Sequence, residues 1–219
     1  MYSHYYYLSV PSHKSSTSKK RPVQPPQRSN GKLRVAAILE AAEAVIAEKG
    51  YEAATMAEIA SRSGTKIGSL YRFFPNKESL ADTMVACARE DLNAAFDQFN
   101  AKLSGLSVRT FSDELLSLLF EPVFKKPALM KLLDAGPNWS SKRDEFRSAV
   151  LHHIANTVIV FRPNISRATA SDIALVILLN IKAASTHTHM AASALGEFRD
   201  MVRLYVETRL RRPKSEAER

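Results

Sequence analysis

Between residues 55 and 77 the chain carries side chains suited to binding a polyanion. Hydroxyl and cationic donors hold phosphate oxygens, and such contacts make affinity salt-dependent while carrying little sequence information. A lysine can also donate to O6 and N7 of guanine, and an isoleucine can touch the methyl group of thymine. The hydroxyl-bearing and basic candidates for phosphate contact are Thr55, Ser69, Tyr71, Lys66, Arg72 and Lys77.

The residues that would read bases open a short helix expected from about Lys66 to Phe73. We predict that Thr65, Lys66 and Ile67 face the base edges there. Gly68 leaves room for the helix to approach a sugar-phosphate strand closely. Lys77 is expected at the start of the following helix, where backbone N–H groups add to the attraction for phosphate.

The elements that position these side chains are indicated by helix caps and breaks. Apolar residues recur at helical spacing over residues 33–46, and Gly50 can end that helix in a left-handed conformation. Thr55-Met56-Ala57-Glu58 is a capping box that starts a short second helix, and Gly64 breaks it. Asn76 is the expected N-cap of a long fourth helix reaching about residue 102. A helix, a glycine turn and a short helix form the helix-turn-helix arrangement.

The rest of the chain predicts only further helices. No alternating strand pattern is present, so the expected fold class is all-α, with about nine helices in a three-helix N-terminal helix-turn-helix domain and a C-terminal helical domain. The C-terminal helices are expected over about residues 108–124, 127–135, 141–161, 169–188 and 193–212.

Two stretches, Thr55–Ala60 and Ser63–Leu80, resemble the TetR (tetracycline-repressor-like) family. That family's pattern is a helix ending in glycine, a T-x-x-x-I-A segment, a glycine turn, G-[ST]-L-Y-x-[HYF]-F and K-E-x-L, and all these pieces occur here in order. The resemblance covers about residues 33–85. One departure is Lys66, which stands where family members often carry serine. It leaves the N-cap of the recognition helix open, with Thr65 as the alternative.

The resemblance implies a repressor that a small molecule releases from a palindromic operator. It also implies a ligand cavity enclosed by the fourth to eighth helices, in which apolar walls are combined with a few polar groups. The expected ligand is a small apolar or amphipathic molecule. The alternative function is a ligand-independent DNA-binding activator or architectural regulator. The candidate ligand-binding residues are Phe120, Phe124, Met130, Trp139, His153 and Asn180.

The last two helices have amphipathic patterns that predict a homodimer. Two such helices can pair with their symmetry mates as a four-helix bundle, which is also how the resembled family dimerises. A dimer would place two recognition helices about 34 Å apart, one turn of DNA. The predicted interface residues are Ile173, Val176, Ile177, Ile181, Phe198, Met201, Val202 and Tyr205, and the polar residues opposed to them on the last helix are Arg199, Arg203, Glu207 and Arg211.

Charge is concentrated at the N-terminus. The first 80 residues carry +6 of the net +9, and residues 1–31 contain five basic residues and no acidic one. We expect residues 1–31 to form a disordered basic arm, either inserting into a minor groove or acting as a solvated tail. The expected organisation continues with a DNA-binding domain over 32–80, a ligand-binding and dimerisation domain over 81–212 and a tail over 213–219.

Several functional classes are excluded by what the sequence lacks. The single cysteine, Cys87, rules out an internal disulfide and a cysteine-rich metal site. No run approaches the roughly 18 apolar residues of a membrane span, so a cytoplasmic protein with no membrane partner is expected. His187 and His189 would diverge by about 200° on a helix, which argues against a shared metal ion. No nucleotide-binding, nucleophile or metal-ligand motif is present, so no enzyme activity, metal or cofactor is expected.

Overall fold

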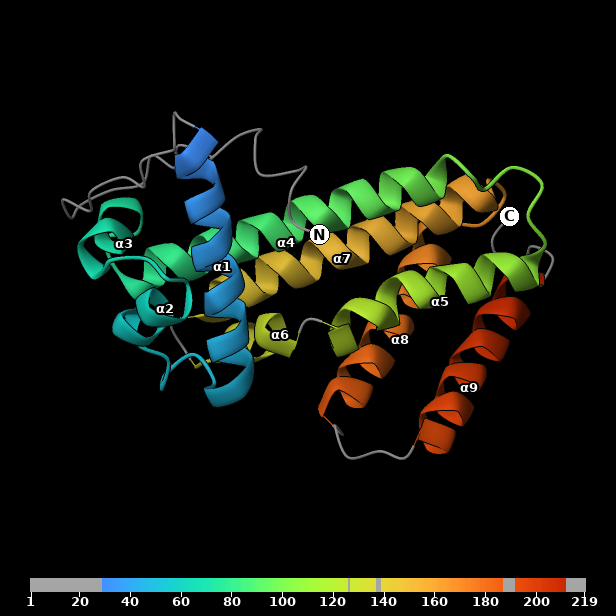
Figure 1. The fold of residues 1–219 in the computed structure, drawn as a ribbon. Helices are drawn as coiled ribbons and strands as arrows, with labels where there is room; N and C mark the ends of the chain where they lie inside the picture. The colour runs from blue at the N-terminus through green and yellow to red at the C-terminus, as the bar shows by residue number, and fades with distance from the viewer. Residues whose placement is uncertain (1–28, 126, 137–138, 187–191, 212–219) are drawn as a thin grey trace. The chain divides into compact units, whose positions relative to one another are not determined.

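In the computed structural model every element found is a helix, over the described residues 29–125, 127–136, 139–186 and 192–211 (Figure 1). This confirms the all-α fold class. The helices divide into two compact units. Unit 1 contains residues up to 91 together with residues 126–140, and unit 2 contains residues 92–125 and those from 141 onward. The predicted arm lies outside the described residues as far as residue 28, as does the predicted tail.

Unit 1 contains the helix-turn-helix and a later short helix. Helix α1 begins at Ser29, inside the stretch that was expected to be a disordered arm. No proline lies between Pro26 and this residue, so the helix can start earlier than the apolar pattern indicated. The helices of unit 1 are α1 (Ser29–Lys49), α2 (Met56–Arg62), α3 (Ile67–Phe73), the first part of α4 (Lys77–Asn100) and α6 (Pro127–Leu133).

The turn signals at the ends of α1 and α2 are confirmed. Gly50 and Gly64 have φ of +82° and +62°, the left-handed region that side chains with a Cβ rarely adopt. The Thr55 hydroxyl accepts from the backbone N–H of Glu58 at 3.2 Å, as the capping box predicts. The Glu58 carboxylate, however, accepts from Lys49 Nζ at 2.6 Å. Glu58 thereby ties α2 to the end of α1.

Helix α4 begins where the Pro75-Asn76 signal places it. The side-chain oxygen of Asn76 accepts from the backbone N–H of Ser79 at 2.8 Å, and the Ser79 hydroxyl donates to the Asn76 carbonyl at 2.8 Å. This confirms Asn76 as the cap. The connection between α3 and α4 is therefore only three residues long and locally fixed.

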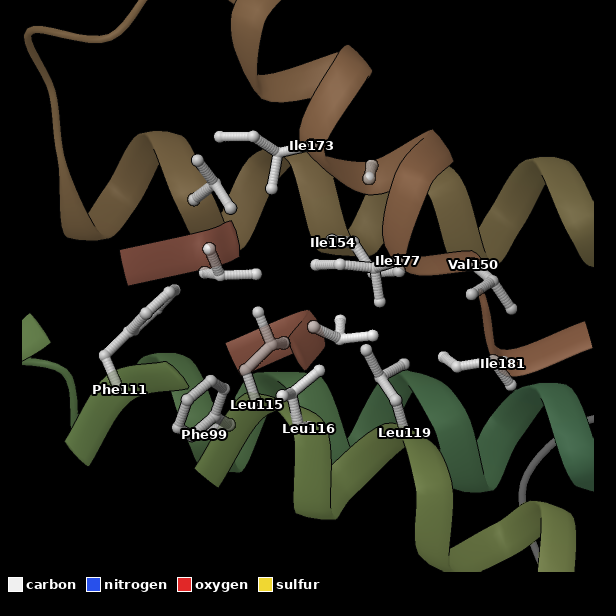
Figure 2. Close-up of a cluster of buried hydrophobic side chains, with 14 of the residues drawn as sticks. Phe99, Phe111, Leu115, Leu116, Leu119, Val150, Ile154, Ile173, Ile177 and Ile181 are labelled. Atoms are coloured by element: carbon white, nitrogen blue, oxygen red, sulfur yellow. The ribbon is translucent and has the colours of Figure 1, made fainter. Parts of the chain in front are cut away.

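Unit 2 is built around an aliphatic and aromatic core (Figure 2). Leu115 and Leu119 of α5 face Ile154 of α7 and Ile173 and Ile177 of α8 across this core, and all five are buried. The helices of unit 2 are the rest of α4, α5 (Val108–Lys125), α7 (Ser140–Phe161), α8 (Arg167–Thr186) and α9 (Ala192–Arg211).

Candidate nucleic-acid interface

Helix α3 presents a polar and basic face above a buried one. Leu70 is fully buried and Phe73 is 6% exposed, so the other side of the helix must face outward. Ile67 and Tyr71 are 44% and 48% exposed, although both are large side chains. Lys66, Gly68 and Arg72 are exposed as well, and nothing lies within 4 Å of where a Cβ would stand on Gly68. The structure thus brings five of the candidate DNA-binding residues onto one accessible helix.

Thr65 does not belong to this face. Its side chain is only 8% exposed, and its hydroxyl points back toward the Ser63 carbonyl at 3.5 Å. The N-cap of α3 is Lys66, in an extended backbone conformation and with no side-chain cap bond. The prediction of Thr65 as a base-reading residue or cap was therefore wrong, because the residue closes the turn after α2 instead.

Lys77 also has a different role from the one its charge suggested. Its ammonium group donates to the backbone carbonyls of Tyr51, Glu52 and Ala54 at 2.8, 3.0 and 3.0 Å. It lies 4.5 Å from the centre of the Tyr51 ring. An ammonium group has three N–H donors, so all three are used within the protein. The prediction that this side chain contacts phosphate is corrected to a structural role.

Two further hydroxyl residues and one arginine complete the candidate interface. Thr55 is exposed while its hydroxyl oxygen caps α2, and Ser69 is half-buried. Arg34 Nη1 of α1 lies 3.5 Å from Ser69 Oγ, so α1 adds a positive charge beside α3. The sequence did not place Arg34 among the side chains beside α3, because helical spacing alone does not show which turn of α1 meets α3.

Arg62, another basic residue of this domain, is engaged by an acidic partner. It makes a two-pronged ion pair with Glu48 at 2.5 and 2.7 Å. The hydrogen bond from Arg62 lowers the pKa of the Glu48 carboxyl, and burial opposes that effect. The pair links α2 to α1, so we assign Arg62 a structural role and not a phosphate contact.

The six candidate ligand-binding residues are not gathered in one unit. Phe120, His153 and Asn180 belong to unit 2, whereas Met130 and Trp139 belong to unit 1. Trp139 is 3% exposed and packs edge-on against Tyr51, with ring centroids 5.2 Å apart. The Asn180 amide donates to the Val176 carbonyl of its own helix at 2.8 Å. The side chain of Phe124 lies outside the described residues.

His153 is the candidate with the most developed polar environment. Its ring stacks on Phe96 at 4.9 Å, and Nε2 lies 2.7 Å from Oδ1 of Asn93, both on α4. Burial lowers the pKa of His153 from its ordinary value of 6.5, the neighbouring His152 lowers it further, and Asp97 opposes the shift. The folded protein therefore favours the neutral imidazole.

The depressed pKa of His153 predicts a pH dependence of stability. As pH falls through about 6.5 the unfolded chain takes up a proton that the folded chain resists, so stability is lost on acidification. We expect the unfolding temperature of the wild-type protein to fall more steeply between about pH 7.5 and 5.5 than that of His153→Gln. Thermal unfolding followed by circular dichroism measures this, and equal slopes would contradict it.

The predicted dimer stripe on α8 is buried inside the protomer. Ile173 and Ile177 are 0% exposed and Ile181 is 6% exposed, and Figure 2 shows all three in the core of unit 2. Val202 of α9 is equally buried. The assignment of these four residues to the interface was wrong, because an apolar stripe marks the covered face of a helix but not what covers it. Three others, Val176, Phe198 and Tyr205, are half-buried.

A different apolar surface is exposed on these two helices. Leu175 and Leu179 of α8 are 40% and 51% exposed, and Met201 and Leu204 of α9 are 52% and 56% exposed. Helices α8 and α9 contact each other in unit 2. Met201 is the one predicted interface residue that belongs to this set, which we call the α8–α9 apolar face.

Two of the four polar residues expected on the outer side of α9, Arg203 and Glu207, are buried, whereas Arg211 is exposed. Arg203 is 9% exposed and Glu207 is 6% exposed. The Arg203 guanidinium bonds the carboxylates of Asp200 and Glu207 at 3.0 and 3.2 Å and lies 3.4 Å from Asp113 of α5. These pairs satisfy the charges, so the polar side of α9 can pack on α5 and leave Met201 and Leu204 outside.

Two kinds of site are absent from the described residues. No helix there is both long and apolar enough to cross a membrane. No group of three or more His, Cys, Asp or Glu side chains there is placed to hold a metal ion. His187 and His189, considered above as a metal pair, lie outside the described part of the chain.

The exposed α3 face lies on a helix-turn-helix whose other side is buried, which is the arrangement of a DNA-binding motif. Residues 38–84 match the family model described as bacterial regulatory proteins, tetR family. The chain is 33% identical over 86 residues to the HTH-type transcriptional repressor KstR2 of Rhodococcus jostii, covering 39% of this chain and 41% of that protein. It is 37% identical over 68 residues to the repressor KstR of Mycolicibacterium smegmatis, covering 31% of this chain and 32% of that one.

Solved structures share the fold over most of the chain. Salmonella enterica GusR superposes with a TM-score of 0.65 at 20% identity, covering 82% of this chain and 96% of its own. FadR of Bacillus subtilis in complex with stearoyl-CoA gives 0.60 at 18% identity, covering 79% and 97%. The matches to curated relatives span only about two fifths of their length or less. The similarity to the TetR-family model is confined to residues 38–84, and over most of its length the chain shares the all-α fold of these solved structures.

Proposed function

We propose that this protein is a dimeric transcriptional repressor that binds a palindromic DNA operator in the cytoplasm. The observation that carries the proposal is the outward face of α3, where Lys66, Ile67, Tyr71 and Arg72 are exposed above the buried Leu70. Lys66 and Ile67, at the start of the helix, read bases in the major groove. Tyr71, Arg72, Ser69 and Thr55 position the protein on phosphates.

We further propose that two copies associate through the α8–α9 apolar face. Four large apolar side chains are exposed on two helices that contact each other, and exposed apolar surface on adjacent elements is typical of an interface. The symmetric pairing of two helices from each copy gives a four-helix bundle. Two recognition helices about 34 Å apart then read two half-sites of opposite orientation.

We propose that a small apolar or amphipathic molecule weakens operator binding. Phe120, His153 and Asn180 of unit 2 support this, since they combine aromatic surface with polar groups in one compact unit. One solved relative in fold, FadR of Bacillus subtilis, is bound to stearoyl-CoA, an amphipathic molecule. A ligand releases DNA only if it binds the released state more tightly than the DNA-bound state.

Selection of bound sequences from random duplex DNA tests the proposal. The expected result is a palindrome of two half-sites, followed by weaker binding of that duplex when a cognate small molecule is added. A single half-site would contradict dimeric reading. Binding that no metabolite, drug or lipid alters would contradict the sensing part alone and favour a ligand-independent activator or architectural regulator, which a footprint with transcript counts would then separate.

Two substitutions on α3 should have different signatures. Lys66→Ala should relax base preference at one position of each half-site, costing about 1–3 kcal/mol on the selected duplex. Arg72→Ala should weaken all duplexes alike and reduce the slope of log affinity against log salt by about 1 per half-site. Titrations of selected and scrambled duplexes at several salt concentrations measure both effects. Identical behaviour of the two variants would contradict this division of roles.

A further inference from the structure

The Lys77 ammonium closes a loop around the helix-turn-helix. Its three carbonyl partners lie in residues 51–54, just before α2, and Lys77 itself is the first residue of α4, just after α3. The bonds at 2.8–3.0 Å therefore join the two flanks of the segment that carries the recognition helix. Hydrogen bonds from a charged donor to carbonyls are stronger than those from a neutral donor, so they hold residues 51–54 against the start of α4.

Tyr51 forms the floor of this junction. Its ring is 9% exposed and lies beneath the Lys77 ammonium at 4.5 Å. Burial raises the pKa of Tyr51 to about 12, helped by the nearby carboxylates of Glu78, Glu52 and Asp82. The phenol therefore stays neutral, and its electron-rich ring face remains available to the cation.

Trp139 holds Tyr51 from another part of the chain. Its ring meets the Tyr51 ring at 75° and 5.2 Å, the edge-to-face geometry that aromatic pairs prefer. Trp139 follows α6, whose Ala128 and Leu132 are fully buried and whose Lys131 ammonium donates to the Ala47 carbonyl of α1 at 2.6 Å. The segment carrying Trp139 is thus seated in the same unit as the helix-turn-helix.

We propose that Trp139 and Tyr51 are positioning residues for DNA recognition: the Trp139 ring fixes the Tyr51 ring, and Tyr51 fixes Lys77 and with it the spacing between the flanks of the helix-turn-helix. This inference rests on the proposed function. None of the three side chains needs to touch DNA. Loss of the contact between the two rings leaves the α3 side chains exposed but lets the recognition helix shift. Affinity for a specific duplex therefore falls more than affinity for a non-specific one.

The test compares specific with non-specific affinity in full-length variants. Trp139→Leu is expected to lower the ratio of affinities for the selected and a scrambled duplex about tenfold, and Trp139→Phe to keep it within about twofold, because phenylalanine keeps an aromatic edge. Phe111→Leu is the matched control, a buried aromatic of unit 2 that should lose stability without changing the ratio. If the ratio falls equally in Phe111→Leu and Trp139→Leu, the proposal is overturned.

A spectroscopic measurement covers the case in which Trp139→Leu does not fold. Trp139 is the only tryptophan of the chain, so the tryptophan emission reports the surroundings of this one ring. Lys77→Met should shift that emission to longer wavelength and increase its quenching by acrylamide. Lys102→Met, which replaces an exposed lysine of unit 2, should change neither. Unchanged emission in Lys77→Met would overturn the proposal. A wild-type protein that binds no duplex would instead refute the proposed function, while the emission test would still decide the stack.

Discussion

Replacing Leu179 by glutamate is expected to turn a dimer into a folded monomer with little operator affinity. Leu179 is 51% exposed on the α8–α9 apolar face, so a carboxylate there stays hydrated in the free protomer and is buried only on association. Loss of the second reading head removes the gain from simultaneous binding, about 100-fold or more. Sedimentation should give half the wild-type mass, and a duplex titration should show the lost affinity.

The matched substitution on the opposite side of α8 should behave differently. Ile177 is fully buried in unit 2, so Ile177→Glu places a charge in the core and should unfold the protomer. Leu204→Glu on α9 should reproduce the effect of Leu179→Glu. A Leu179→Glu variant that remains dimeric would refute the assigned interface, and a folded monomeric Ile177→Glu would restore the stripe first predicted from sequence.

Replacing Phe111 by alanine is expected to cause the largest loss of stability of any single truncation discussed. Phe111 is 0% exposed, and its ring stacks on Phe161 at a centroid distance of 4.0 Å and lies 5.8 Å from Phe99. Truncation leaves a cavity lined by these rings, and the free energy of unfolding should fall by about 3–5 kcal/mol. Urea unfolding of the wild-type and variant proteins measures the difference.

A surface position of the same helix serves as the control for Phe111. Glu114 of α5 is exposed, so Glu114→Ala should change the free energy of unfolding by less than about 0.5 kcal/mol. If Phe111→Ala cost no more than Glu114→Ala, the close packing of unit 2 around the three aromatic rings would be disproved.

Local signals in the sequence predicted the helix-turn-helix well. The positive φ of Gly50 and Gly64 and the caps at Thr55 and Asn76 depend on residues within a few positions of one another. Local chemistry is visible in a sequence because it needs no knowledge of distant partners.

The errors arose where partners from distant segments decide the outcome. Lys77 looks like a phosphate ligand until residues 51–54 place three carbonyls around it. Ile173 looks like an interface residue until α5 is found opposite it (Figure 2). Arg203 looks solvated until Asp113, ninety positions earlier, is found beside it. Periodicity gives the faces of a helix, but tertiary packing decides what each face meets.

Helix α6 is separated in sequence from the other helices of unit 1, and this delays the completion of unit 1 during translation. Residues 126–140 complete this unit, yet the 34 residues of unit 2 from Leu92 to Lys125 are made before them. At about 5–20 residues per second, the ribosome needs several seconds to deliver that missing piece. The nascent chain therefore carries α1 with its α6-binding side uncovered while α5 emerges, and a chain cut after residue 105 would keep that apolar side permanently open to chaperones and proteases.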